Sequence, residues 1–200
     1  MTLKIGILIF DGAEELDFVG PWEVFTMAKA LKPDTSEVIL VAERDGPVRC
    51  AKGMRVLPDT TTAACGALDV LLIPGGQGTR REVENTALLA WIAATAKSAR
   101  WVSSVCTGAL LLTAAGPARG KRVTTHWAYV DALRERREAG EVLENFRYVQ
   151  DGNIVTAAGV SAGIDMALWL TGQLFDPIFA RRVQHQMEYD PLPPYGGLTQ

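Results

Sequence analysis

The chain has 200 residues, which is enough for one domain with a sizeable buried core. Its formal net charge of −3 and its scattered basic residues give no electrostatic argument for binding nucleic acid. The apolar N-terminus is too short for a signal peptide and no apolar run can cross a bilayer, so we expect a cytoplasmic protein without a membrane partner. The three cysteines lack CxxC spacing and fit a reducing compartment better than a disulfide framework or a structural zinc site.

Strand-like and helix-like segments alternate along the chain. Short runs rich in Ile, Leu and Val predict strands, and longer segments with caps predict helices. In chain order the sequence predicts a strand over 3–10, a helix over 17–31 with a break near Gly20-Pro21, a strand over 37–42, a hairpin over 47–57, a strand over 68–73, a helix over 82–99, a strand over 101–105 followed by a helix closed by Gly116-Pro117, a helix over 128–138, a hairpin formed by 146–150 and 154–157, and helices over 160–174 and 177–187.

This alternation predicts an α/β fold, in which a mostly parallel sheet carries helices on both faces. No internal repeat or linker divides the chain, so we expect a single domain over residues 1–200. The Pro-rich stretch 188–200 is expected to form an extended C-terminal arm, and its two tyrosines favour packing on the body.

The strand at 101–105 leads directly into Cys106 and then into a helical segment. Thr107 and Gly108 are the small residues that a sharp strand-to-helix turn needs, as in a nucleophile elbow. A thiol at a helix N-terminus ionises more easily, and the thiolate is the reactive form. The equally weighted alternative is an inert core cysteine. Cys50 and Cys65 have no helix start behind them and are interpreted as structural.

Three predicted strands end in residues that could take part in catalysis. They lead to acidic residues ending at Asp17, to Gly75-Gly76 and to Cys106. Sites in open α/β sheets gather beyond the carboxyl ends of strands, so a thiol, carboxylates and a glycine-rich backbone would converge on one rim. Gly75 and Gly76 are either a flexible strand exit or a source of backbone N–H groups that form an oxyanion cradle with the Thr107 N–H. Their spacing is not that of a phosphate-binding loop.

The carboxylates and histidines each have an ordinary structural interpretation. Asp17 and Glu15 precede a helix and suit N-terminal capping, whereas a carboxyl held against a thiol would have a raised pKa and carry a proton. His126 is either a partner for the thiol or, by preference, a hydrogen-bonded residue at a helix start, and its loss is expected to matter much less than loss of Cys106. The chain has two histidines, and these with scattered carboxylates predict no metal site.

These motifs, in this order, resemble those of the ThiJ/PfpI family of the class I glutamine amidotransferase-like superfamily. The resemblance covers nearly the whole chain and extends to the bacterial isocyanide hydratases. The motifs that carry it are Asp11-Gly12-Ala13-Glu14-Glu15-Leu16-Asp17 with Gly20-Pro21, Ile73-Pro74-Gly75-Gly76, Val105-Cys106-Thr107-Gly108-Ala109, Thr124-Thr125-His126-Trp127, Gly159-Val160-Ser161-Ala162-Gly163-Ile164-Asp165 and Glu188-Tyr189-Asp190-Pro191.

The resemblance implies a flavodoxin-like three-layer sandwich, a homodimer and no metal or organic cofactor. It implies that Cys106 lies on a strained elbow, that Asp17 sits beside it and that Thr107 lies next to the site. Peptidase-like members carry a histidine directly after the cysteine. Thr107 stands at that position here, so a Cys–His protease dyad is not expected.

The function that this resemblance implies is hydration of a small-molecule isocyanide to an N-formamide through a cysteine thioimidate. Cys106, Asp17 and Thr107 are then the catalytic candidates, with Gly75 and Gly76 as binding residues. Glu15 and His126 are the supporting candidates. The alternatives are another thiol enzyme acting on glyoxals or amides, a redox sensor, and a ligand-binding module related to sensor domains of transcription regulators. The sequence carries no helix-turn-helix region, so action as such a regulator on its own is not expected.

Overall fold

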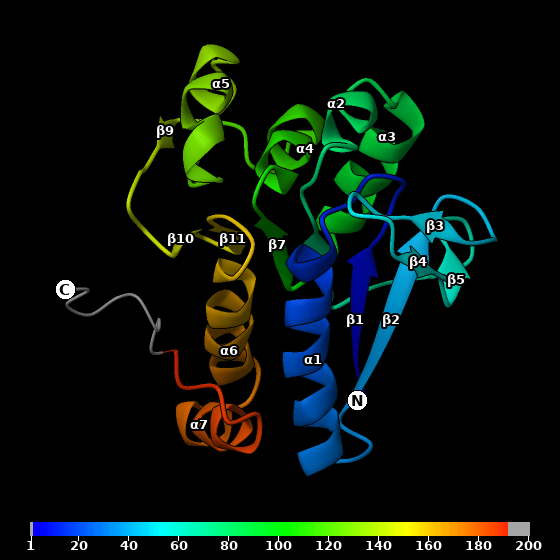
Figure 1. Cartoon of the computed structure of the whole chain (residues 1–200), viewed down its shortest axis with the longest axis vertical. Helices are drawn as coiled ribbons and strands as arrows, with labels where there is room; N and C mark the ends of the chain where they lie inside the picture. The colour runs from blue at the N-terminus through cyan, green and yellow to red at the C-terminus, as the bar shows by residue number, and fades with distance from the viewer. Residues whose placement is uncertain (1, 192–200) are drawn as a thin grey trace, which may run out of the picture.

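A computed structural model of the chain describes residues 2–191 and confirms the predicted α/β architecture (Figure 1). The central sheet has seven strands in the order β10-β11-β7-β6-β1-β2-β5, the arrangement of a flavodoxin-like sandwich. Within the described residues, β10 and β11 are antiparallel and the other neighbouring pairs are parallel. The strands are β1 (Leu3–Leu8), β2 (Ser36–Ala42), β5 (Thr60–Thr61), β6 (Val70–Ile73), β7 (Trp101–Val105), β10 (Tyr148–Asp151) and β11 (Ile154–Ala157).

Helices cover both faces of this sheet. The chain crosses from β1 to β2 in one direction and from β6 to β7 in the other, and right-handed crossovers then place their helices on opposite faces. In Figure 1, α1, α6 and α7 pack together on one face, and α3 packs with α4 on the other. The helices are α1 (Glu15–Leu31), α2 (Thr79–Glu82), α3 (Thr86–Ala96), α4 (Gly108–Ala115), the 3-10 helix η1 (Trp127–Tyr129), α5 (Val130–Glu135), α6 (Ala162–Leu174) and α7 (Pro177–Gln186).

The middle strands explain where the core lies. The whole of β6 is buried, as are the last four residues of β1 and of β7, because both faces of these strands are covered by helices. The carboxyl ends of β1, β6 and β7 are neighbours in the sheet. The loops that follow these three strands therefore meet at one rim, as the sequence predicted.

Two small two-stranded sheets lie outside the central one. The predicted hairpin over 47–57 is confirmed as the antiparallel pair β3 (Val48–Arg49) and β4 (Arg55–Val56). The parallel pair β8 (Arg122–Val123) and β9 (Glu141–Val142) was not predicted, and neither was β5. These strands have only two residues each, which is too short for an alternating or continuous apolar pattern to be recognised.

The helix predicted over 82–99 is wrong in its extent, because α2 ends at Glu82 and the segment forms only α3, over Thr86–Ala96. Asn85 caps α3 by accepting a 3.2 Å hydrogen bond from the Leu88 N–H. A capping side chain offers the backbone an alternative to helix continuation. The helix predicted over 128–138 is also shorter, since it begins as η1 and α5 ends at Glu135.

The break predicted in the first helix is also absent, and α1 runs through Pro21. A Cβ on Gly20 would lie 2.9 Å from the Ile164 side chain, and a Cβ on Gly163 would lie 3.3 Å from the Pro21 ring. The two helices therefore approach closely along Gly20 and Gly163. Pro21, which cannot donate a backbone hydrogen bond, lies at this close contact between the helices.

The predicted arm over 188–200 falls largely outside the described residues. Of its described part, Tyr189 packs back on the body through a 2.9 Å hydrogen bond from its hydroxyl to Asp165 Oδ1. Among the described residues, no helix has the length and apolar character needed to span a membrane.

Candidate active site

Cys106 occupies the sharp turn between β7 and α4 with a backbone φ of +56°. This left-handed conformation is strained for a residue with a Cβ, and surrounding contacts hold it. The Cys106 N–H donates to the Ala158 carbonyl at 2.9 Å, and the Thr125 hydroxyl donates to the Cys106 carbonyl at 2.8 Å. A Cβ on Gly108 would lie 2.3 Å from the Ile73 carbonyl oxygen, so the turn needs glycine there. The predicted elbow is confirmed as a structural feature.

The sulfur of Cys106 is buried among donors and one carboxyl group. Backbone N–H groups of Thr107 and Val160 and the Thr107 hydroxyl face it and favour the thiolate. Burial opposes them, and with the adjacent Asp17 carboxylate it raises the pKa of the Cys106 thiol to about 12. The expectation of an easily ionised thiol is therefore wrong for the resting protein, because desolvation outweighs the helix start.

Asp17 lies in the first turn of α1, yet its side chain does not cap that helix. Its Oδ2 accepts a 2.8 Å hydrogen bond from the Gly75 N–H on a distant loop, and its Oδ1 has no hydrogen-bond partner among the described residues. Burial is the main cause that raises the pKa of Asp17 to about 7, while the Gly75 N–H and the Cys106 side chain lower it. Asp17 can therefore accept and release a proton near neutral pH.

Gly75 and Gly76 bring the three loops close together. A Cβ on Gly75 would lie 2.5 Å from the Thr107 nitrogen and 2.9 Å from Asp17 Oδ2. The Gly76 N–H donates to the Thr107 hydroxyl oxygen at 3.0 Å. In this structure the two glycine N–H groups thus position Asp17 and Thr107, and the expected oxyanion role stays a prediction.

Thr79 is a site-supporting residue that the sequence analysis missed. Its hydroxyl lies 3.2 Å from the Thr107 hydroxyl and donates to the Gly76 carbonyl at 2.8 Å. Arg80 reaches the same carbonyl at 2.9 Å and stacks its guanidinium over the Tyr129 ring. No motif marks Thr79, because a threonine at a helix start has an ordinary sequence context.

The two supporting candidates lie apart from the thiol. Glu15 Oε1 accepts a 2.8 Å hydrogen bond from the Lys52 N–H, so it fastens the β3–β4 hairpin to α1. The Lys52 ammonium pairs with Glu14 and partly lowers the pKa of Asp17, a contact that the sequence analysis also missed. His126 Nδ1 accepts the Ala128 N–H at 3.2 Å, as the helix-start interpretation expected.

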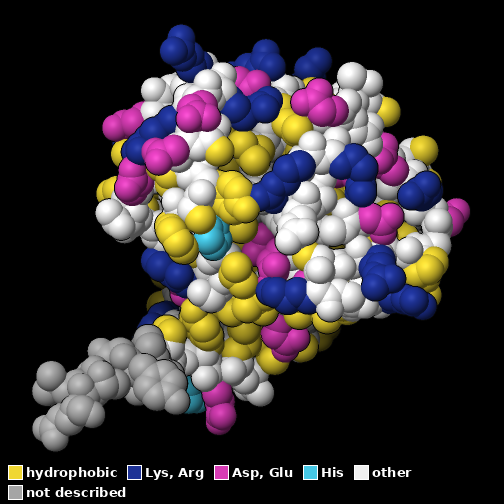
Figure 2. Space-filling model, turned by 45° about the horizontal axis from the view of Figure 1, so that its top comes forward, with side chains coloured by type: hydrophobic (Ala, Val, Ile, Leu, Met, Phe, Trp, Pro, Cys, Tyr) yellow, Lys and Arg dark blue, Asp and Glu magenta, His cyan; other side chains and the backbone are white. Residues whose placement is uncertain are grey.

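A cavity of about 460 Å³ adjoins the elbow from the His126 side. Thr125 and Val160, which contact Cys106, form part of its lining. Its rim carries two exposed aromatic side chains, Trp127 at 82% and Phe146 at 53% exposure. Figure 2 shows hydrophobic side chains gathered around a histidine on one face of the molecule. Within residues 2–191, no cluster of His, Cys, Asp and Glu is suited to a metal ion.

The fold and the site together define a class of protein: an α/β sandwich with a thiol at a strained strand–helix turn and a buried carboxyl group beside it. The chain belongs to the DJ-1/PfpI family, whose pattern matches residues 3–173. This confirms the resemblance seen in the motifs.

Several relatives resemble the chain over most of its length. An isonitrile hydratase of Pseudomonas putida is 43% identical over 98% of this chain and 82% of its own length. The crystal structure of a ThiJ/PfpI family protein from Pseudomonas syringae superposes with a TM-score of 0.89 and 33% identity, over 98% of this chain and 78% of that chain. The transcriptional regulator CdhR of Pseudomonas aeruginosa is 28% identical over 93% of this chain, which spans 55% of the regulator.

Proposed function

We propose that this protein hydrates isocyanides to N-formamides, with Cys106 as the nucleophile and Asp17 as the proton carrier. The observation that carries the proposal is the contact between the buried Cys106 thiol and the buried Asp17 carboxyl group, in which burial raises the pKa of both groups. The 43% identity to an isonitrile hydratase over 98% of the chain supports a related hydratase role.

The first half-reaction adds the thiol across the terminal isocyanide carbon. Asp17 accepts the Cys106 proton while the sulfur forms a bond to that carbon, and the carboxylic acid then returns the proton to the same carbon. The product is a thioimidate in which nitrogen is doubly bonded to a carbon carrying hydrogen and sulfur. The electrophilic carbon has no leaving group, so the step needs only a nucleophile and a proton source. No cofactor is required by this chemistry.

The second half-reaction hydrolyses the thioimidate. Asp17 takes a proton from water as the oxygen attacks the carbon and passes that proton to the nitrogen, and the second water proton moves through Asp17 to the departing sulfur. Collapse of the tetrahedral adduct breaks the carbon–sulfur bond and releases the N-formamide and the Cys106 thiol. Thr107 is proposed to orient water or stabilise developing charge at the sulfur, and the contacts of its hydroxyl with Gly76 and Thr79 support this role.

The cavity beside Val160 is the proposed place for the organic substituent of the substrate. Its aromatic rim of Trp127 and Phe146 suits an apolar group. We further propose, on the resemblance, that the protein works as a homodimer. A cytoplasmic location likewise remains a proposal.

The regulator relatives favour one other function, a ligand-binding module without turnover. The match to CdhR covers 93% of the residues of this chain. The two functions differ in outcome, because a binding module would hold a small electrophile but release no product.

The test incubates purified protein with p-nitrophenyl isocyanide and follows the formamide by absorbance. Wild-type protein is expected to turn over, and Cys106→Ala is expected to show no turnover. Cys65→Ala is the matched control, because Cys65 is also a buried free cysteine but lies outside the site. Equal turnover by wild type and Cys106→Ala would refute the mechanism, and binding without turnover by wild type would favour the module.

A further inference from the structure

The loop between β11 and α6 presents a backbone donor to the thiol in a strained conformation. Val160 has a φ of +46°, which is unfavourable for a β-branched residue, and its N–H faces the Cys106 sulfur. Such strain persists only where the surroundings hold it. Something must therefore fix this loop.

Arg147, which precedes β10, makes hydrogen bonds to the loop on both sides of Val160. Its backbone carbonyl accepts the Ala158 N–H at 2.9 Å. Its Nη2 donates to the Ser161 hydroxyl at 3.2 Å, and its Nε donates to Asp165 Oδ2 at 2.6 Å. Val160 lies between residues that the same arginine holds.

The start of α6 depends on this arginine more than on its own cap. The Ser161 side chain makes no capping hydrogen bond to the helix, since its hydroxyl receives the Arg147 guanidinium. Asp165 lies in the first turn of α6, and its other oxygen accepts the Tyr189 hydroxyl at 2.9 Å. Arg147 and Tyr189 thus occupy both oxygens of the carboxylate that anchors this helix end.

We propose that Arg147 is a positioning residue for Cys106: by holding Ser161 and Asp165, its guanidinium keeps the Val160 N–H directed at the sulfur. The role of Cys106 as nucleophile rests on the proposed function, whereas the positioning itself does not. Arg147 is half-exposed and acts through Val160 without touching the reacting atoms. Removing it should turn the N–H away from the sulfur and make the thiolate harder to form.

The test measures alkylation of Cys106 by iodoacetamide between pH 6 and 9, with modification at Cys106 read by peptide mass spectrometry. At pH 8, Arg147→Gln is expected to react about tenfold more slowly than wild type, the change that corresponds to a thiol pKa higher by about one. Arg147→Lys should lie between them, because one ammonium can pair with Asp165 without also reaching Ser161.

The matched control is Arg136→Gln. Arg136 makes a comparable ion pair, with two 2.9 Å hydrogen bonds to Glu138, but does not touch the 158–161 loop. It is expected to react as wild type does, even if both variants lose thermal stability. An unchanged rate in Arg147→Gln, or an equal loss in Arg136→Gln, would overturn the proposal. No isocyanide is used, so a failed hydratase assay does not affect this test.

A milder pair of variants covers the case in which Arg147→Gln does not fold, as judged by circular dichroism. Ser161→Ala removes only the hydroxyl that receives Nη2, and Asp165→Asn weakens the ion pair. Each is expected to slow alkylation about threefold at pH 8. Wild-type rates in both would overturn the proposal.

Discussion

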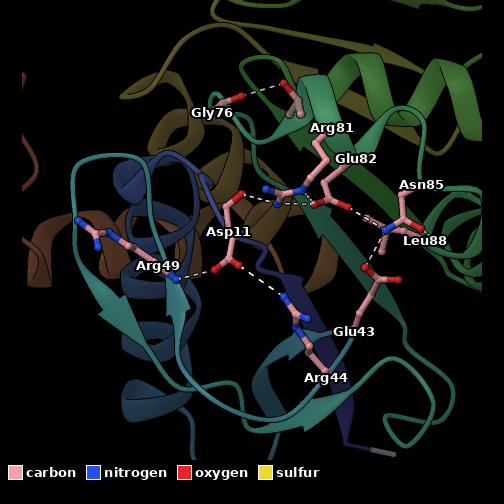
Figure 3. Close-up of polar contacts among 10 residues, drawn as sticks. Asp11, Glu43, Arg44, Arg49, Gly76, Arg81, Glu82, Asn85 and Leu88 are labelled. Carbon is pink, nitrogen blue, oxygen red and sulfur yellow. Dashed lines mark hydrogen bonds and ion pairs between the residues drawn. The ribbon is translucent and has the colours of Figure 1, made fainter.

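Two buried carboxyl groups lie beyond the carboxyl ends of the strands, and their surroundings differ completely. Glu82, at the end of α2, accepts hydrogen bonds from Arg81 at 2.6 and 2.8 Å and from Asn85 at 2.8 Å. Asn85 also donates to Glu43 at 2.7 Å, as Figure 3 shows. Asp17 has the Gly75 N–H on one oxygen and no hydrogen-bond partner among the described residues on the other.

The comparison contrasts a buried carboxyl group that contacts a cation and an amide donor with one that has a single backbone donor. Glu82 links Arg81 to Asn85 and serves the structure. Burial is the main cause that raises the pKa of Asp17 to about 7, and the Gly75 N–H offsets it only in part. Size does not separate the two sites. The cavity at Glu82, about 730 Å³, exceeds the 460 Å³ cavity beside the elbow, whose lining includes Thr125 and Val160 next to Cys106.

The largest expected effect comes from removing the proton carrier. Asp17→Asn should lower kcat/KM for an aryl isocyanide about 10³-fold, because general acid–base catalysis contributes about 10²–10⁴. Steady-state kinetics from pH 6 to 9 measure this loss. Glu82→Gln is the matched control at the paired carboxylate and should keep kcat/KM within about twofold, assayed well below its unfolding temperature. A wild-type rate in Asp17→Asn would break the distinction between the two carboxyl groups.

The pH dependence of stability sharpens the comparison further. The pKa of Asp17 rises from 3.8 to about 7 on folding, so between these values the native state binds more protons than the unfolded state. Stability from this group is fully present below pH 4 and is lost as the pH rises through 7, by up to about 4 kcal/mol. The free energy of unfolding in urea, measured from pH 4 to 8, should therefore fall more in wild type than in Asp17→Asn.

Other carboxylates act in the opposite direction, which is why the difference between the two proteins is the quantity to measure. Ion pairs and hydrogen bonds lower the pKa of Glu138 and of Asp151. The stability that each carboxylate contributes to the folded protein is therefore lost in acid. Their contributions cancel when Asp17→Asn is subtracted from wild type. Parallel pH profiles of the two proteins would contradict the raised pKa of Asp17.

Sequence patterns predicted the sheet except β5, most of the helices, and the convergence of a thiol, carboxylates and glycines on one rim. Each of these features is local: an apolar strand closed by turn residues, or a small residue after a cysteine. Because parallel strands end at a common edge, the local patterns at three strand ends were enough to predict that a thiol and carboxyl groups lie on the same rim.

What the sequence could not supply depends on contacts between distant segments. Thr79 meets Thr107 across 28 positions and carries no signature of its own. Capping and proton transfer look alike for Asp17 until the Gly75 N–H is seen 2.8 Å from its carboxylate. The direction of the Cys106 pKa was misjudged because the helix start is visible in the sequence, whereas the degree of burial is not.

The smallest expected effect is a loss of stability when the paired carboxylate of Glu82 is replaced. Glu82→Gln keeps the side-chain volume but replaces the ionic contact with Arg81 by a weaker one and gives Asn85 a poorer acceptor. Because Arg81 is largely solvent-exposed and can be hydrated once unpaired, the loss should be about 1–3 kcal/mol. The melting temperature at pH 7 measures it, and Arg81→Gln should lose less, since Glu82 keeps Asn85. A Glu82→Gln protein as stable as wild type would mean that pairing does not stabilise this carboxylate, and the contrast with Asp17 would then rest on proton transfer alone.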